Sequence, residues 1–183
     1  MILVPKYLMY RVIFILLSLL IFTSCSSNHI EEYYDIFSYN YDFQFYDFEA
    51  GECVLKGSTV STLKSVIDNK ESAVFMITAP TCMSCQGFVE IANDISKNKD
   101  ITIYNIDPYS SLYPVFDTND FDILLNILKE IGINNESEFF MPVILIINKG
   151  KIESYYNEHN DDMNYETLYS KIENIIDKSI LIK

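Results

Sequence analysis

The sequence predicts an α/β sandwich with a mixed central sheet, on three observations. Apolar runs of strand length alternate with segments of helical apolar spacing, as in Ala73 to Thr78 followed by Phe88 to Ile95. Val143 to Ile147 is followed by Asn148-Lys149-Gly150, a typical hairpin turn, and then by a return strand. The last segment, Tyr165 to Ile176, has the clearest one-sided helical pattern. Strands that alternate with helices and close with a hairpin are typical of this class.

The first half of the domain begins with aromatic residues. From Tyr39 to Phe45 they alternate with polar residues, which predicts a half-buried strand, and Cys53 to Lys56 is expected to pair back on it as a second short strand. The tyrosine-rich stretch from Tyr33 to Tyr46 is accordingly interpreted as sheet and core. Apolar residues at helical spacing from Val60 to Ile67 then predict a helix.

The second half continues the alternation. Ile101 to Ile106 is the next expected strand, and Asp107 to Asn119, which contains two prolines, is expected to be a loop. It leads into a helix from Phe121 to Leu128, which Gly132 is placed to end. Asn164 is the expected N-cap of the last helix, since its side chain can accept from the first backbone N–H groups.

Composition narrows the function classes. The 183 residues include 26 Asp and Glu against 13 Lys and Arg. Nucleic-acid binding depends on Lys and Arg that neutralise phosphates, so this acidic chain argues against it. The acidic composition also argues against membrane binding through electrostatic attraction to anionic lipid alone. No repeat or Gly/Pro-rich linker divides the chain, and one domain of ordinary size is expected.

The N-terminus reads as an export signal. Positive charge at Lys6 and Arg11 precedes an uncharged apolar stretch from Val12 to Phe22, then Thr23-Ser24-Cys25. The residues from Phe22 to Cys25 resemble a bacterial lipobox, which implies lipid attachment at Cys25 and cleavage before it. The expected organisation is a lipoprotein signal peptide in residues 1–25, a tether in 26–38 and one domain in 39–183. Without Lys6 and Arg11, 13 − 2 = 11 basic residues face 26 acidic ones, a net charge near −15.

Two alternatives to this N-terminus are open. A membrane-spanning anchor needs roughly 20 apolar residues, about twice the length of the uncharged run. Met9 is an alternative start, which gives a shorter signal headed by Arg11 and the same mature protein. With either start the domain is expected outside the cytoplasm, held to a bacterial membrane by lipid. Such a compartment lets thiol pairs oxidise.

The candidate catalytic motif is Cys82-Met83-Ser84-Cys85, which lies between an expected apolar strand and an expected helix. At a helix start, unpaired backbone N–H groups and the positive end of the dipole favour a thiolate. Cys82 is therefore the candidate nucleophile. Cys85, nearly one turn further on, can attack a mixed disulfide that Cys82 forms with a substrate, and is the candidate resolving thiol.

The segment from Ala79 to Cys85, at the end of an apolar strand and the start of a helix, resembles the active-site segment of the thioredoxin family. Met141-Pro142, directly before the apolar strand that enters the hairpin, is similar to that family's cis-proline segment. The resemblance covers roughly Val60 to Lys178 and implies a thioredoxin-like α/β/α sandwich, to which the aromatic N-terminal strand region is an addition. It implies that Met141 and Pro142 position an extended substrate beside the sulfurs, and it implies no cofactor.

Three departures from thioredoxin bear on the mechanism. Thr81 stands where an aromatic residue is usual, and Met83-Ser84 replaces Gly-Pro between the cysteines. Met76 occupies the position of the buried aspartate that assists proton transfer in thioredoxin. Without that acid, slower turnover as a reductant is expected, unless a water or another carboxylate serves.

Other interpretations of the motif are weaker. A structural disulfide across so short a loop constrains the unfolded chain little. A metal site needs more ligands, and Cys53, His29 and His159 are scattered along the chain. Covalent haem attachment requires His after the second cysteine, where Gln86 stands. Cys53 is interpreted as a buried core thiol, with a third redox partner as the functional alternative.

The function expected from sequence is that of a membrane-anchored, extracytoplasmic thiol-disulfide oxidoreductase. Its expected partners are exported cysteine-containing proteins or peptides and a redox partner at or outside the membrane. The alternative is a non-catalytic accessory module, similar to the thioredoxin-like accessory proteins of bacteriocin export, that is dedicated to one client. The direction of electron flow is left open.

Overall fold

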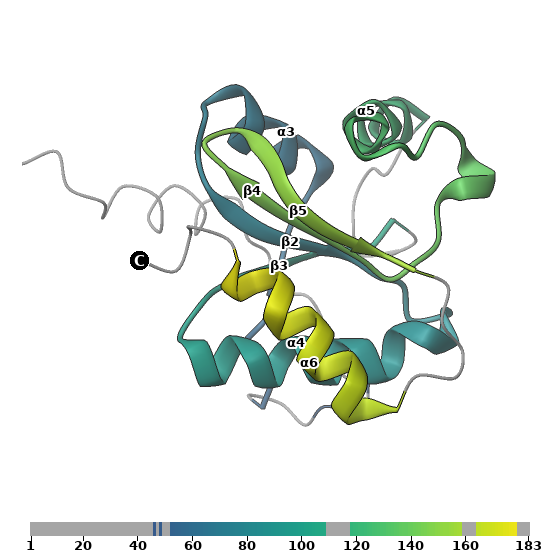
Figure 1. Cartoon of the computed structure of the whole chain (residues 1–183). Coiled ribbons are helices and arrows are strands. Elements are labelled where there is room, and N and C mark those ends of the chain that lie inside the picture. Colours follow the sequence, from purple (N-terminus) through teal and green to yellow (C-terminus); the bar gives the residue numbers. More distant parts are fainter. Residues whose placement is uncertain (1–45, 47, 49–51, 109–117, 159–163, 179–183) are drawn as a thin grey trace, which may run out of the picture. The chain divides into compact units, whose positions relative to one another are not determined.

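The computed structural model describes Tyr46, Phe48 and residues 52–108, 118–158 and 164–178 (Figure 1). The expected signal peptide with Cys25, the tether and the aromatic strand from Tyr39 to Phe45 lie outside these residues, as do His29, His159 and most of the loop after Asp107. Within the described part of the chain, no helix has both the length and the apolar character needed to cross a bilayer.

Five strands form one mixed sheet in the order β1-β3-β2-β4-β5. The strands β1, β3 and β2 run parallel to one another, whereas β4 is antiparallel to both β2 and β5. Their bounds are Lys56–Gly57 (β1), Ala73–Ile77 (β2), Ile103–Ile106 (β3), Val143–Asn148 (β4) and Lys151–Asn157 (β5). The central strand β2 is buried along its whole length, as expected for a strand covered on both faces.

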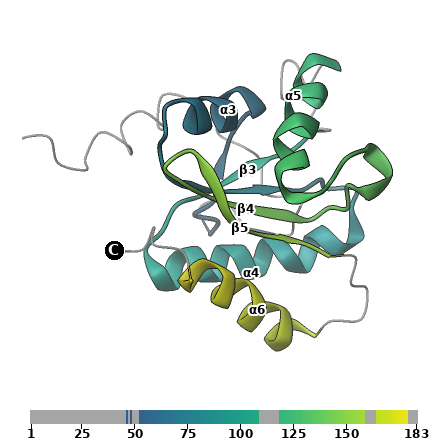
Figure 2. The same ribbon diagram turned by 45° about the horizontal axis from the view of Figure 1, so that its top comes forward.

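Helices cover the two faces of this sheet in pairs (Figures 1 and 2). Helices α3 (Val60–Asp68) and α5 (Thr118–Leu128) contact each other on one face, and α4 (Met83–Lys99) and α6 (Tyr165–Asp177) contact each other on the opposite face. Two short 3-10 helices, η2 (Lys129–Ile131) and η3 (Glu136–Glu138), lie between α5 and β4 in the chain. The result is an α/β/α sandwich with a mixed sheet, as the sequence predicts.

Alternation along the strands divides the core between the two faces. Val74 and Met76 of β2 pack with Phe88 of α4 in an apolar cluster, which α6 completes. Phe75 points to the other face, where its ring lies 5.5 Å from that of its register partner Tyr104. Both faces of β2 are therefore packed, and the helix pairs hold the strand ends in place.

Local signals account for the ends of most elements. Asn164 is the N-cap of α6, as predicted, and its side chain accepts from the Thr167 N–H at 2.9 Å. Gly132 has a φ of 87° and ends the 3-10 turn that follows α5, which confirms its predicted role. Gly150, with a φ of 75°, completes the β4–β5 turn against the backbone of Ile67, so closely that a side chain there would collide with it.

The predicted strand from Cys53 to Lys56 is wrong for most of its length. Of these four residues only Lys56 lies in a strand, β1, which runs parallel to β3, and the aromatic segment expected to pair with it lies outside the described residues. The Val54 N–H donates to the side chain of Asn93 on α4 at 2.9 Å. Because that backbone donor bonds to a helix side chain, it is not available to a sheet ladder.

Candidate active site

The start of helix α4 places the two motif cysteines. After β2, the Cys82 N–H donates to the Ala79 carbonyl at 3.0 Å, and the Cys85 N–H donates to the Cys82 carbonyl at 3.0 Å. Cys82 is the N-cap of the helix, with extended backbone angles and no side-chain capping bond. Pro80, which has no N–H to donate, lies in the turn between strand and helix. The predicted position of Cys82 at the helix N-terminus is thus what the structure has.

The two sulfurs differ in exposure. Both residues are free thiols, but Cys82 is half-buried whereas Cys85 has 0% of its surface exposed. Burial raises the pKa of Cys85 well above its ordinary value, and hydrogen bonding to the Cys82 side chain raises it further. The charge of Asp107 acts in the same direction. Cys85 is therefore held as a neutral thiol next to the more accessible Cys82.

Met141 and Pro142 lie beside Cys82. The antiparallel pairing of β2 with β4 matches Ile77 with Val143, so the residues after β2 and those before β4 meet at one edge of the sheet. The Cys82 thiol donates to the Met141 carbonyl, with 3.6 Å between sulfur and oxygen. The peptide bond between Met141 and Pro142 is cis. Pro142 is buried and Met141 is half-buried.

The surface around Cys82 carries exposed apolar side chains. Met83, directly after Cys82, is 88% exposed, and Phe140, directly before Met141, is 43% exposed. Thr81 is exposed and Ser84 is half-buried in the first turn of α4. Such large apolar side chains at the surface mark contact sites when they gather at one place. Here Met83 follows Cys82 in the chain, and Phe140 precedes Met141, whose carbonyl accepts from the Cys82 thiol.

Polar side chains are buried at the same edge of the sheet, below the start of α4. The Tyr46 and Thr78 hydroxyls are hydrogen-bonded at 2.9 Å, and Thr78 donates onward to the Asn105 side chain at 2.8 Å. Asp107, just after β3, is only 1% exposed. Sequence reasoning assigned Asp107 to a loop and missed it. The available signal was a carboxylate immediately after an apolar strand that runs parallel to the strand before the motif.

Met76, which the resemblance to thioredoxin matches with a buried aspartate, is part of the core. It is fully buried in β2, between its register partners Asn105 on β3 and Ile144 on β4. Its thioether has no proton to exchange and packs in the apolar cluster beneath α4. Any acid that serves Cys85 must therefore come from a different position.

Cys53 lies toward the other end of α4. Its neighbour Val54 bonds to Asn93, which is eight residues beyond Cys85 and hence about 12 Å further along the helix. Burial raises the pKa of Cys53 to about 11, although the Leu55 backbone and the Lys97 charge oppose this. A thiol with so high a pKa is a poor nucleophile at neutral pH. This setting favours the interpretation of Cys53 as a core thiol.

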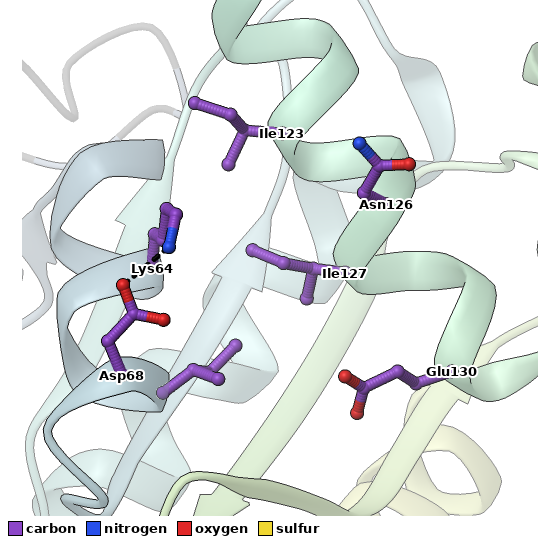
Figure 3. Close-up of a pocket in the computed structure, with 7 residues that line it drawn as sticks. Lys64, Asp68, Ile123, Asn126, Ile127 and Glu130 are labelled. Carbon is purple, nitrogen blue, oxygen red and sulfur yellow. Dashed lines mark hydrogen bonds and ion pairs between the residues drawn. The ribbon is translucent and has the colours of Figure 1, made fainter.

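A pocket on the opposite face of the sheet holds none of these thiols. It lies between α3 and α5, has a volume of about 240 Å³, and is lined by Ile67, Ile123 and Ile127 among others (Figure 3). At its rim Lys64 forms an ion pair with Asp68 along α3. Asn126 of α5 and Glu130 of η2 complete the lining. Within the described residues, no group of three or more His, Cys, Asp or Glu side chains is arranged to hold a metal ion.

Comparisons with known proteins find similarity to solved structures only. No family profile matches the chain, and no curated protein matches it. Among solved structures, the chain is similar to thioredoxin O2 from Arabidopsis thaliana in its oxidized state. The two share 16% sequence identity with a TM-score of 0.40, over 64% of this chain and 89% of the other.

Proposed function

We propose that this chain is a membrane-anchored, extracytoplasmic thiol-disulfide oxidoreductase that acts on cysteines of exported proteins. The observation that carries the proposal is the unequal pair of thiols at the start of one helix, with Cys82 accessible and Cys85 fully buried. Disulfide exchange through a mixed disulfide needs one sulfur that a substrate can reach and one that is shielded from it. The strand-turn-helix geometry supplies both.

The proposed reduction proceeds in two exchanges. The Cys82 thiolate attacks a substrate disulfide, so that a mixed disulfide forms and one substrate sulfur leaves as a thiolate. The Cys85 thiolate then attacks the Cys82 sulfur, the Cys82–Cys85 bond forms, and the second substrate sulfur leaves with the electron pair of the broken bond. The substrate gains two electrons and the chain is left with a disulfide. Oxidation of a substrate dithiol is the same sequence in reverse.

An extended polypeptide is the substrate that the surroundings favour. The Met141 carbonyl lies at the Cys82 sulfur and Pro142 precedes β4, so a substrate strand is proposed to pair with the Met141 backbone as it presents its sulfur to Cys82. Exposed Met83, next to Cys82, and Phe140, next to Met141, are proposed to offer apolar contacts to this strand, and Thr81 and Ser84 complete the residues of the motif. No Lys, Arg or His occurs from Ala79 to Phe88, so substrate charge is not selected by a cation within this stretch.

The location is proposed from the N-terminal sequence. Residues 1–25 have the charged head, apolar stretch and small residues before a cysteine that mark an exported lipoprotein, with Cys25 as the lipidated residue. Cys25→Ala should release the protein from the membrane fraction, and labelled fatty acid should be incorporated only when Cys25 is present. Membrane retention of the Cys25→Ala protein would contradict the lipid anchor without bearing on the redox activity.

The activity is tested by reduction of insulin disulfides, with and without Cys82. The wild-type chain should catalyse the reaction in the presence of dithiothreitol, and Cys82→Ala should abolish catalysis. The reduction potential of the Cys82–Cys85 pair then gives the direction, since a value near about −270 mV indicates a reductant and one near about −120 mV an oxidant. Absence of a reversible couple would rule out the enzyme. If the two thiols form a reversible redox couple but the protein does not reduce unrelated disulfide substrates, the result would instead favour an accessory module dedicated to one client.

A further inference from the structure

Asp107 is a carboxylate buried at the candidate active site. It is 1% exposed, and within the described ranges no other Asp, Glu, Lys or His is buried to this degree. Ionisable side chains are rarely buried because removal of their charge from water is costly. A carboxylate buried at an active site is therefore expected to have a structural or a catalytic role.

The sheet register places Asp107 beneath the start of α4. Ile77 of β2 pairs with Ile106 of β3, and the Thr78 N–H donates to the Ile106 carbonyl at 3.1 Å, which continues the parallel ladder by one residue. Thr78 and Asp107 are therefore neighbours just beyond the two strand ends. Asp107 is two residues after Asn105, whose side chain accepts from Thr78, so the two residues fall on the same side of the sheet.

That side of the sheet is the one that α4 covers. Asn105 pairs in register with Met76, and Met76 and Cys85 belong to one apolar cluster under the helix. The charge of Asp107 reaches the Cys85 thiol, since it contributes to the raised pKa of that thiol after burial and the Cys82 side chain. Cys85 has no exposed surface through which bulk water could take its proton.

We propose that Asp107 is the proton acceptor for Cys85 when the mixed disulfide is resolved, a role that rests on the proposed oxidoreductase function. The Cys85 sulfur gives its proton to an Asp107 oxygen and attacks the Cys82 sulfur as a thiolate. The Cys82–Cys85 bond forms, and the substrate sulfur leaves with the electron pair of its broken bond to Cys82. In the reverse direction Asp107 returns the proton to Cys85. Asp107 thus fills the role left open by Met76, from the neighbouring strand.

Among the described residues, few titratable groups lie around this step. The Cys82 and Cys85 thiols face it from α4, and the Tyr46 phenol, which is hydrogen-bonded to Thr78, faces it from the segment before β1. The sequence from Ala79 to Phe88 contributes no Lys, Arg or His. The pH dependence of Cys85 reactivity should therefore report mainly on the two thiols and Asp107.

Stopped-flow reaction with 5,5′-dithiobis(2-nitrobenzoate) separates the two exchanges. We envisage the full-length chain in detergent with Cys25 and Cys53 both replaced by serine, so that only the motif thiols react. Attack by Cys82 releases the first equivalent of thionitrobenzoate, and attack by Cys85 on the resulting mixed disulfide releases the second. Asp107→Asn should slow the second release at neutral pH by about 10²-fold, the lower range for loss of a general base, and leave the first release unchanged. The deficit should shrink as pH rises, because hydroxide then removes the Cys85 proton.

The opposite result has a definite meaning. If Asp107 acted only through its charge, its neutralisation would lower the pKa of Cys85 and speed the second release. A second release by Asp107→Asn that equals or exceeds the wild-type rate at neutral pH would therefore overturn the proposal. Asp107→Glu should recover much of the rate because it retains a carboxylate. Thr78→Val is the matched control, since it disturbs the same buried edge and should leave the pH profile of the second release in place.

A measurement on the unaltered side chains covers the case in which Asp107 variants fail to fold. The carboxyl carbon resonance of Asp107 should titrate with a different midpoint in the dithiol and disulfide forms, because only the dithiol form shares a proton with it. Identical titrations in the two forms would overturn the role. If the wild-type chain releases only one equivalent of thionitrobenzoate, both the proposed function and the role of Asp107 are refuted. If wild type and Asp107→Asn both release two equivalents rapidly, only the role of Asp107 is refuted.

Discussion

The two ends of helix α4 are built in different ways. At the N-terminal end Cys82 is the N-cap but makes no side-chain capping bond, no acidic residue lies in the first turn, and Met83 is 88% exposed. At the C-terminal end Lys97 and Lys99 lie in the last turn, where positive charge complements the helix dipole. Asp100 then ends the helix in the left-handed conformation.

The C-terminal half of α4 is fastened to its neighbours by polar side chains. Three of them bind α6: Asp94 accepts from Tyr165 at 2.6 Å, Asn98 donates to Tyr169 at 3.0 Å, and Lys99 contacts Asp177 at 2.8 Å and Glu173 at 3.1 Å. The polar contacts that hold α4 against α6 are therefore at the C-terminal end of α4, away from the motif thiols. The helix N-terminus, with its positive dipole end, is left to the Cys82 sulfur.

Loss of the buried motif thiol should have the largest effect. Cys85→Ala removes the resolving sulfur, so turnover with insulin should fall by about 10³-fold or more and mixed disulfides at Cys82 should accumulate. The readouts are the turnover rate and the mass of trapped adducts. The matched control is Cys53→Ala, in the segment that packs near the C-terminal half of α4, which should keep turnover within about twofold of wild type. A comparable loss of turnover in Cys85→Ala and Cys53→Ala would contradict the proposed difference in function between the two ends of α4.

The reactivity of Cys53 should differ from that of an ordinary thiol by about two orders of magnitude. Its pKa is raised from 9.0 to about 11, so the thiolate fraction at neutral pH is about a hundredfold lower than for an exposed cysteine. Alkylation by iodoacetamide should be slower by that factor and should rise about tenfold per pH unit until pH approaches the pKa. Mass spectrometry of the Cys53 peptide measures the rate. Rapid alkylation at neutral pH would restore Cys53 as a candidate redox partner.

The hydroxyl of Thr78 should matter for stability on the side of the active site. Thr78→Val leaves the Tyr46 hydroxyl and the Asn105 side chain without their shared partner, at a cost of about 2 kcal/mol in the free energy of unfolding. Urea denaturation measures it. The control is Thr62→Val on α3, whose hydroxyl bonds to the partly exposed Thr59, which water can also reach. A cost at Thr62 equal to that at Thr78 would show that the buried edge is not specially dependent on its hydrogen bonds.

Much of the fold was predictable because its signals are local. The helical spacing from Val60 to Ile67, the hairpin turn at Lys149-Gly150 and the Asn164 cap each rest on a few neighbouring residues, and each is present in the structure. The segment from Cys53 to Lys56 was misjudged because its backbone bonds to Asn93, a partner 39 positions from Val54 that no local pattern reveals. Pairing between distant segments is set by tertiary packing and not by periodicity.

The candidate site divides in the same way. Cys82 and Cys85 lie within one short motif, and Met141-Pro142, directly before an apolar strand, was found through its resemblance to the thioredoxin-family cis-proline segment. Asp107 was missed because its relation to Cys85 depends on the register between β2 and β3, which decides which residue beyond β3 lies next to Thr78. A shift of one residue in that register would turn Asp107 to the other face of the sheet.

The ion pairs of Lys99 should have the smallest effect. Lys99→Ala removes contacts to Asp177 and Glu173 at the surface, and we expect a loss of at most about 1 kcal/mol in the free energy of unfolding, smaller at high salt. The hydrogen bond to Asp177 raises the pKa of Lys99 above 10.5, so this stabilisation is complete below pH 10.5 and is lost as pH rises through the raised value. Salt-dependent thermal denaturation of Lys99→Ala against Lys64→Ala, which breaks an exposed pair within α3, measures the difference. If Lys99→Ala also slowed the attack of Cys85 on the mixed disulfide, the contacts between α4 and α6 at the C-terminal end of α4 would be coupled to the thiol exchange at its N-terminal end.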